Sequence, residues 1–342
     1  MNMKRKSINI LLLSAALTLT GNALMAQEPG FMQFNSDPLN ISPALAGRYG
    51  TDWRVMVNAR SQWLGKTSTY NTRQVTIDAK VKEVDETNYF GVGGMFISDN
   101  AMDGLYKSNY FSLNGSYHFA LDANGNGLAL GIGVVGNNTR VDFSQLSFDQ
   151  QLGSSGFDMS IASGETAMRN GTSHVSSSAG LVYTYETDYV YVDAGISGYR
   201  FINFQKSFYN DPKQTIAPRY SAHAYISMTL SDRLSVQASA MHLLINRRGL
   251  TMAGGMLGII LAEQSTGPLQ MLHLGAHYKS SGALAPTVGY TMGNIDIGLS
   301  SDVNLSSATS GSVVNRALEL TMSYNMFSYS FRRKVGRYHI PY

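Results

Sequence analysis

The sequence predicts an all-β fold: a transmembrane antiparallel β-barrel of about 14 strands, with short periplasmic turns and longer outer loops. Three observations predict it. Apolar and polar residues alternate with a period of two through most of the chain. The alternating segments run for roughly 9–13 residues, close to the ~9–11 that a tilted strand needs to cross a bilayer and longer than the ~5–6 of soluble strands. The connections between them alternate between short and long.

The composition agrees with this fold and excludes others. Charged residues make up 14% of the 342 residues, below the ~25% of soluble domains. Cysteine is absent, so no disulfide framework supports the fold. Beyond residue 26 no apolar run approaches the ~18 residues of a membrane-spanning helix. The 20 Tyr and 14 Phe residues argue against disorder.

The first residues have the pattern of a secretory signal peptide. Lys4, Arg5 and Lys6 precede an apolar run over 8–19, and the expected cleavage follows Ala26. Segment 1–26 is therefore predicted to be a cleaved signal peptide that sends the chain to the outer membrane of a Gram-negative bacterium. Its removal takes three of the 26 basic residues and leaves 23 against 23 acidic ones. That balance gives no reason to expect a nucleic-acid partner.

Next comes a segment, 27–51, without clear periodicity. Pro29, Pro38 and Pro43 exclude a long helix there. It is too rich in Phe, Leu and Ile for a linker, so we expect it to pack against something. A ring of about 14 strands encloses more space than its side chains fill, so water or a plug must occupy the lumen. We therefore assign 27–51 as an N-terminal periplasmic or plug segment and leave open whether the lumen is open or plugged.

The barrel itself is predicted over 52–325. In its first strand Trp53, Val55 and Val57 face one way, and Arg54 and Asn58 face the other. The predicted strands are 52–63, 69–81, 88–98, 108–121, 127–138, 173–186, 188–200, 219–230, 233–245, 253–263, 269–280, 284–292, 294–303 and 316–325.

The connections identify the two ends of this barrel. Those after even strands are short, for example 122–126 and 231–232. Several after odd strands are long, namely 141–171, 201–218 and 305–315, although 64–68 and 281–283 are short. Short periplasmic turns opposite longer outer loops are typical of outer-membrane barrels, and a soluble sandwich has no reason to sort its loops this way. An even strand count also places the C-terminal segment 326–342 in the periplasm.

Each candidate motif for catalysis, cofactor binding or metal binding lacks a feature that its chemistry requires. The pattern G-x-G-x-x-G at 131–136 lies inside a predicted strand without the helix that dinucleotide binding requires, so strand curvature or close packing explains it better. The Asn/Gly turn at 122–127 lacks the acidic twelfth residue of a calcium loop. His273 and His277 would be ~13 Å apart on a strand, too far to share a metal. We expect no catalytic, cofactor or metal residues, and no enzyme.

Several short motifs carry a family resemblance. In the N-terminal segment they are Gln33-Phe34, Pro38-Leu39-Asn40 and Ser42-Pro43-Ala44-Leu45-Ala46-Gly47, followed by Arg60-Ser61-Gln62-Trp63 at the end of the first strand. The last strands add Gly298 to Asn304 and Ala317-Leu318-Glu319-Leu320. Over essentially the whole mature chain this pattern resembles the PorP/SprF family of the Bacteroidetes type IX secretion system. Ser42 departs from it, because the family usually has Asn before the Pro-Ala pair.

The resemblance implies a non-enzymatic outer-membrane component of type IX secretion or gliding machinery that assists export or surface attachment of cargo proteins. The partners implied are outer-membrane lipid, other secretion components and a secreted cargo protein. The motif residues expected to contact partners are Gln33, Phe34, Pro38, Asn40, Pro43, Ala44, Gly47, Arg60, Gln62 and Trp63.

Two further expectations come from the residues themselves. The basic C-terminal tail, with Arg332, Arg333, Lys334 and Arg337, is a candidate docking peptide for a periplasmic partner. A general outer-membrane porin or solute transporter is the alternative function, because a wide lumen is implied either way. The charge-poor strands do not supply the rings of charge that select solutes in a porin constriction.

Overall fold

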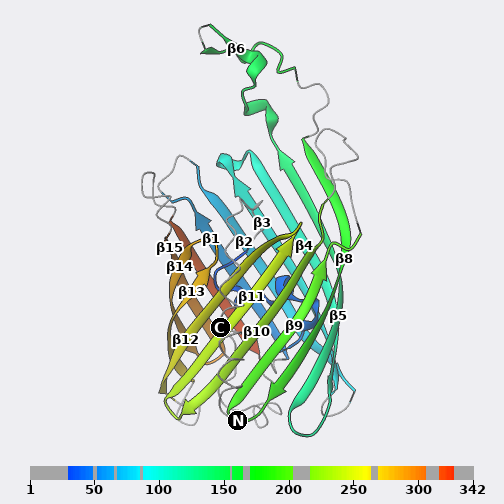
Figure 1. The fold of residues 1–342 in the computed structure, drawn as a ribbon, viewed down its shortest axis with the longest axis vertical. Helices are drawn as coiled ribbons and strands as arrows, with labels where there is room; N and C mark the ends of the chain where they lie inside the picture. Colours follow the sequence, from blue (N-terminus) through cyan, green and yellow to red (C-terminus); the bar gives the residue numbers. More distant parts are fainter. Residues whose placement is uncertain are drawn as a thin grey trace, which may run out of the picture.

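In a computed structural model the chain forms a closed ring of antiparallel strands (Figure 1). The structure describes residues 30–48, 52–64, 68–84, 88–154, 156–164, 170–202, 216–262, 269–305 and 316–326. Around the ring the order is β1-β16-β15-β14-β13-β12-β11-β10-β9-β8-β5-β4-β3-β2, which is fourteen strands within these described ranges. The predicted fold class is therefore confirmed.

The observed strands follow the predicted ones to within a few residues. Both ends of β1 agree to one residue with the prediction. The strands of the ring are β1 Trp53–Gln62, β2 Tyr70–Glu83, β3 Tyr89–Ala101, β4 Tyr106–Ala120, β5 Asn126–Val141, β8 Gly171–Glu186, β9 Val190–Tyr199, β10 Arg219–Ser231, β11 Leu234–Ile245, β12 Arg248–Ala262, β13 Gln270–Lys279, β14 Ala283–Met292, β15 Ile295–Asn304 and β16 Ala317–Met326.

One boundary was wrong. We predicted a loop up to residue 252, but β12 begins at Arg248, directly after a two-residue turn. Asn246 and Arg247 both take positive φ angles there, 47° and 64°. A tight hairpin turn requires such angles, and without a glycine at either position the turn was not visible in the sequence. The long loop after β5 also contains a small hairpin that we did not predict, β6 Leu152–Gly153 and β7 Gly156–Phe157.

The ring closes between its first and last strands. Trp53 pairs with Met326 and Gln62 with Ala317, in continuous antiparallel register. At one end of the barrel successive strands are joined by tight turns, such as the one between Met292 and Ile295. The long connection after β5 lies at the opposite end and rises above the ring (Figure 1).

The two faces of the strands have opposite chemistry. Large apolar side chains point outward, with Ile132 72% and Leu113 69% exposed, whereas inward positions carry buried Asn, Ser, Thr and Gln. An apolar exterior over a polar interior is the pattern of a barrel in lipid. On the outer surface near the tight-turn end, Trp53 and Tyr324 pack with ring centroids 5.5 Å apart, as expected of an interfacial aromatic girdle. Within the described ranges no helix is long and apolar enough to span a membrane.

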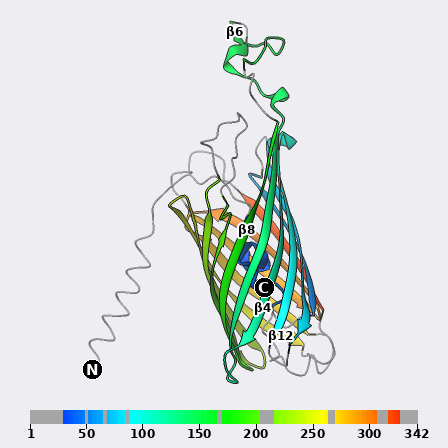
Figure 2. The same cartoon turned by 90° about the vertical axis from the view of Figure 1, so that its right-hand side faces the viewer.

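The N-terminal segment 30–48 lies inside the ring (blue in Figure 2). It consists of three short turns: η1 Phe34–Ser36, α2 Pro38–Ile41 and η2 Pro43–Leu45. Its apolar side chains form a core cluster with side chains from the wall, among them Ala129 and Met241. The predicted signal peptide and the basic C-terminal tail lie outside the described residues.

Candidate functional site

The interior of the barrel, where segment 30–48 meets the wall, gathers many buried polar groups of the described residues. Two features of the sequence shape the segment locally. Pro38 and Pro43 each stand in the first turn of a short helix, where proline needs no N–H partner. The Ser42 side chain accepts a hydrogen bond from the Ala44 N–H at 3.3 Å, which caps the last turn. Leu39, Ala44, Leu45 and Ala46 are fully buried.

A buried glutamate on β16 holds the start of the segment. The Glu319 carboxylate accepts the backbone N–H groups of Met32 and Gln33, each at 2.8 Å. Its Oε2 is also 2.9 Å from a guanidinium nitrogen of Arg60, which pairs in addition with Asp302. Because one guanidinium group and two N–H groups converge on the Glu319 carboxylate, and Arg60 also pairs with Asp302, this site joins the segment, β1, β15 and β16.

The Gln33 side chain extends this anchor. Its amide nitrogen donates to the Ser300 hydroxyl at 3.3 Å, and its oxygen accepts from Thr321 at 3.2 Å. Phe34 packs edge-on against the His277 ring, with centroids 6.2 Å apart. Both residues of the predicted Gln-Phe motif therefore contact the barrel wall.

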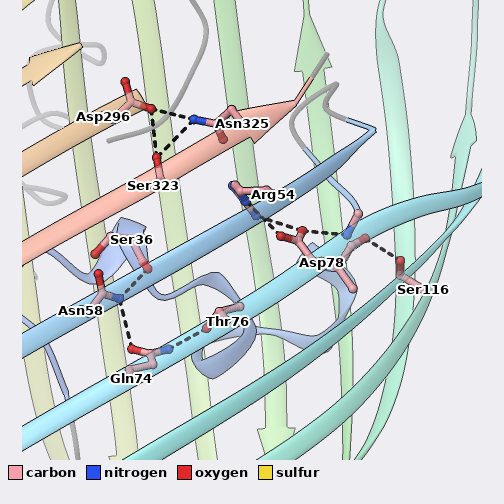
Figure 3. Close-up of polar contacts among 12 residues, drawn as sticks. Ser36, Arg54, Asn58, Gln74, Thr76, Asp78, Ser116, Asp296, Ser323 and Asn325 are labelled. Carbon is pink, nitrogen blue, oxygen red and sulfur yellow. Dashed lines mark hydrogen bonds and ion pairs between the residues drawn. The ribbon is translucent and has the colours of Figure 1, made fainter. Parts of the chain in front are cut away.

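Asp37 and Ser36 hold the segment to the two first strands. The Asp37 carboxylate accepts from the amides of Asn40, at 2.8 Å, and Gln74. Asn58 bridges the same region, since its amide donates to the Ser36 carbonyl at 2.8 Å and to Gln74 at 3.1 Å (Figure 3). Burial raises the pKa of the Asp37 carboxyl to about 7, although these amide hydrogen bonds act in the opposite direction.

The far side of the lumen is held by β9 and β10. The Arg219 guanidinium donates to the Asn40 side-chain oxygen at 2.8 Å and to its carbonyl at 2.6 Å, and lies over the Tyr199 ring at 4.2 Å. The Tyr199 hydroxyl donates to the Leu39 carbonyl at 2.8 Å. In the ring order β10 is seven strands from β1, half of the circumference. The segment is therefore bonded to opposite walls.

The Pro-Ala-Leu-Ala-Gly motif lies against a wall that lacks side chains at its points of contact. A Cβ added to Gly131 of β5 would lie 2.2 Å from the Ala44 nitrogen, and one on Gly91 of β3 would lie 2.2 Å from the Ala46 carbonyl oxygen. Gly180 of β8 faces Ser42 equally closely. Gly91, Gly131 and Gly180 thus form a glycine socket for the segment. Gly131 belongs to the discarded dinucleotide motif, and its contact agrees with the close-packing interpretation.

Gly47 closes the motif with a backbone that only glycine adopts easily. Its φ is +65°, and a Cβ there would lie 2.6 Å from the Ala79 carbonyl oxygen. The Gly47 N–H donates to the Asp78 carboxylate at 2.9 Å. Asp78 also forms a bidentate ion pair with Arg54, with both N···O distances 3.0 Å (Figure 3). Ser116 donates to the Ala46 carbonyl at 2.7 Å.

Other candidates lie elsewhere. Gln62 ends β1, and Trp63 follows it with a positive φ of 61° and packs on Tyr70, with ring centroids 5.6 Å apart. Neither belongs to the network around the segment. His273 and His277 bond separately to Thr291 and Thr287, and no cluster of metal-binding side chains occurs in the part of the chain that the structure describes.

Sequence reasoning missed most of the wall. Glu319 and Asp302 entered it only as parts of family-like motifs, and Asp78, Arg54 and Arg219 were given no role. One signal was available: each is a charged residue at an inward position of a barrel strand. A buried charge needs a partner, so these positions indicate a structure inside the lumen.

Two small cavities lie on either side of segment 30–48. The larger, about 50 Å³, is near the loop end and is lined by residues that include Tyr110, Asn137 and Arg219. The smaller, about 20 Å³, is near the tight-turn end beside Arg54 and Asp296. Space for water thus remains both above and below the segment.

Comparisons with known proteins agree with this architecture. Residues 23–324 match the family described as Type IX secretion system membrane protein PorP/SprF. No curated protein matches the chain in sequence.

Similar solved structures are outer-membrane barrels of distant sequence. They include the Pseudomonas putida toluene transporter TodX, with a TM-score of 0.48 and 10% identity over 80% of this chain and 87% of that one. A Pseudomonas aeruginosa FadL homologue has a TM-score of 0.42 and 10% identity, over 80% and 89%. KdgM porin has a TM-score of 0.39 and 8% identity, over 80% of this chain and 99% of that one.

Proposed function

The chain belongs to the PorP/SprF family of type IX secretion membrane proteins, and from that premise we propose that it is a non-enzymatic component that assists export or surface attachment of cargo. In this proposal the barrel is an anchor in the outer membrane. Its N-terminal segment closes the lumen, so the barrel does not conduct solutes. Its outer loops face cargo, and its periplasmic end faces the rest of the machinery.

One observation supports the closed lumen most directly, the bonding of segment 30–48 to both walls. Glu319, which is paired with Arg60, holds it on one side, and Arg219 and Tyr199 hold it on the other. Contacts of this kind cost a lot to break, because each leaves a buried charge or carbonyl without its partner. A porin would need a lumen free of such a crossing segment.

Conductance in planar bilayers tests this proposal against the porin alternative. We expect the purified full-length barrel to show no frequent open-channel steps, and a chain lacking residues 30–48 to conduct. Asp122→Ala, in an exposed turn, is the control and should behave as wild type. Free conduction by the wild type would overturn the proposed closure. In cells, gene deletion should reduce cargo at the surface and leave solute uptake unchanged, and the reverse result would favour the porin.

We also propose that the basic tail docks a periplasmic partner through Arg332, Arg333, Lys334 and Arg337. The support is the sequence alone: four of the 26 basic residues lie in the last eleven positions of a chain whose strands carry few charges. Deleting 332–342 should leave the heat-modifiable folded barrel intact on gels and abolish co-purification of another secretion component. Unchanged co-purification would contradict it.

A further inference from the structure

The connection between β5 and β8 buries a polar side chain at its centre and exposes several large apolar side chains on its surface. Its described part, 142–154 and 156–164, stands above the ring and contains η4 Phe143–Gln145, η5 Asp149–Gln151 and the β6–β7 hairpin (Figure 1). We call this part the outer excursion. A compact loop normally places its apolar side chains inward and its polar ones in water.

A glutamine occupies the centre of the outer excursion. Gln151 is 5% exposed. Its side-chain amide donates to the Ile161 carbonyl at 2.8 Å and accepts from the Phe148 N–H at 3.0 Å. Its backbone carbonyl accepts from the Asp158 N–H at 2.8 Å. The loop is therefore held together by hydrogen bonds around one amide.

Four large apolar side chains lie on the outside, whereas Phe143, Leu146 and Phe148 are half-buried. Leu152 is 58% exposed, Phe157 55%, Met159 50% and Ile161 45%. These four lie within ten residues, beyond the end of β5 at Val141 and so past the strands that face lipid. A cluster of exposed apolar side chains on such a projection is typical of an interaction surface.

Within the outer excursion every charged residue is acidic. Asp142, Asp149 and Asp158 are exposed, and the sequence has no Lys or Arg from 141 to 168. Hydrogen bonds from Ser160 hold the pKa of Asp158 below its usual value, so this carboxylate stays charged. An anionic lipid surface and a second copy of this loop would both be repelled by these carboxylates. A polypeptide with Lys or Arg beside apolar residues would be attracted.

We propose that the outer excursion is a docking surface for an exported polypeptide segment that combines apolar side chains with flanking lysine or arginine. Leu152, Phe157, Met159 and Ile161 provide the apolar contact, and Asp149 and Asp158 select the positive charge. The inference rests on the proposed function only in naming an exported polypeptide as the occupant.

Designed peptides test the chemistry without knowledge of the cargo. The probes are three fluorescent peptides of equal length, alternating Phe and Lys, Phe and Glu, or Ser and Lys, titrated against the full-length barrel in lipid nanodiscs. We expect the Phe/Lys peptide to bind at least tenfold more tightly than the other two, and empty nanodiscs to give the background. Equal binding of the Phe/Glu peptide would overturn the proposal.

Two variants locate the binding. The combined variant Leu152→Ser, Phe157→Ser, Met159→Ser and Ile161→Ser should weaken Phe/Lys binding at least tenfold. The control Leu121→Ser, similarly exposed at the opposite end, should not. Asp149→Lys with Asp158→Lys changes no apolar residue and should reverse the preference toward the Phe/Glu peptide. If neither variant alters binding, the surface does not dock the peptide and the proposal is wrong.

Surface cargo in cells separates this inference from the proposed function. If gene deletion and the four-serine variant both remove cargo from the surface, the docking surface is supported. If deletion removes cargo and the variant does not, docking is overturned and the proposed function stands. If deletion leaves cargo in place, the proposed function falls, and the peptide titrations still decide the chemistry of the surface. Vesicles of anionic lipid that bind through the excursion would overturn the choice of a polypeptide.

Discussion

Segment 30–48 and the outer excursion are both chains of short turns, yet they treat their apolar residues in opposite ways. The inner segment buries Leu39 and Leu45 completely, and the excursion leaves Leu152 and Phe157 more than half exposed. The inner segment forms hydrogen bonds with strand residues up to 288 positions away in the sequence, as Gln33 does with Thr321. Around Gln151 the excursion finds its partners within its own loop, and at its base the Asp142 N–H donates to the Leu105 carbonyl at 2.8 Å.

The difference teaches where each region's stability resides. Long-range partners on the wall make the inner segment part of the barrel, so damage to either should loosen both. Local hydrogen bonds make the excursion a separate unit, whose surface can change without cost to the strands. Such independence is what a binding loop needs, because its sequence can then follow that of its partner.

The largest expected effect comes from Glu319→Ala. It removes the acceptor for two buried N–H groups and one of the two carboxylates that pair with Arg60. Breaking a buried ion pair from one side costs about 3–5 kcal/mol, so we expect a loss of that order in the free energy of unfolding.

Urea unfolding in phospholipid vesicles measures this loss through tryptophan fluorescence, since the two Trp residues are Trp53 on β1 and Trp63 just after it. Glu83→Ala is the matched control, because its carboxylate pairs with Lys80 but is 62% exposed. Such an exposed pair contributes at most about 1 kcal/mol. Equal losses for the two variants would mean that the inner segment is not held by the wall.

A smaller effect is expected where the wall makes room for the segment. In Gly131→Ala the new Cβ would lie 2.2 Å from the Ala44 nitrogen, so the segment or the strand must shift. Overpacking of this kind costs about 1–3 kcal/mol. The expected result is faster proteolysis of the N-terminal segment in detergent-solubilised barrel, at unchanged secondary structure.

Gly115→Ala provides the control, because nothing lies within 4 Å of a Cβ at that position. Gly115 lies on the neighbouring strand β4, and its substitution adds the same methyl group. Protection of the segment in Gly131→Ala equal to that in Gly115→Ala would show that the glycine socket does not fix the segment.

Much of the fold could be predicted from the sequence, because alternation and strand length are local properties. Trp53, Arg54 and Val55 already indicate the two faces of β1. The interior could be predicted only in outline. The Phe, Leu and Pro content of 27–51 indicated a segment that must pack, but its partners depend on contacts such as Gln33 with Glu319, which are 286 positions apart.

The glycines of the wall show the same limit of sequence-based prediction. The pattern at 131–136 could be interpreted as strand curvature or close packing, since glycine in a strand marks a bend or a close approach. Which chain approaches it is decided by the register of β5 against β4 and β8. The pairing of strands is fixed only once the ring is assembled. Ala44 therefore could not be identified as the neighbour of Gly131 from the sequence.

The smallest expected effect sharpens the comparison most. Phe157→Ala removes an aromatic ring that is 55% exposed, so little buried contact is lost. Surface substitutions of this kind change stability by no more than about 0.5 kcal/mol, and we expect the unfolding free energy to stay within that range. Phe34→Ala is the paired measurement, because Phe34 is 3% exposed and its removal opens a cavity beside His277. A loss in Phe157→Ala as large as that in Phe34→Ala would mean that the excursion packs against the barrel, and would leave no free apolar surface there for a partner.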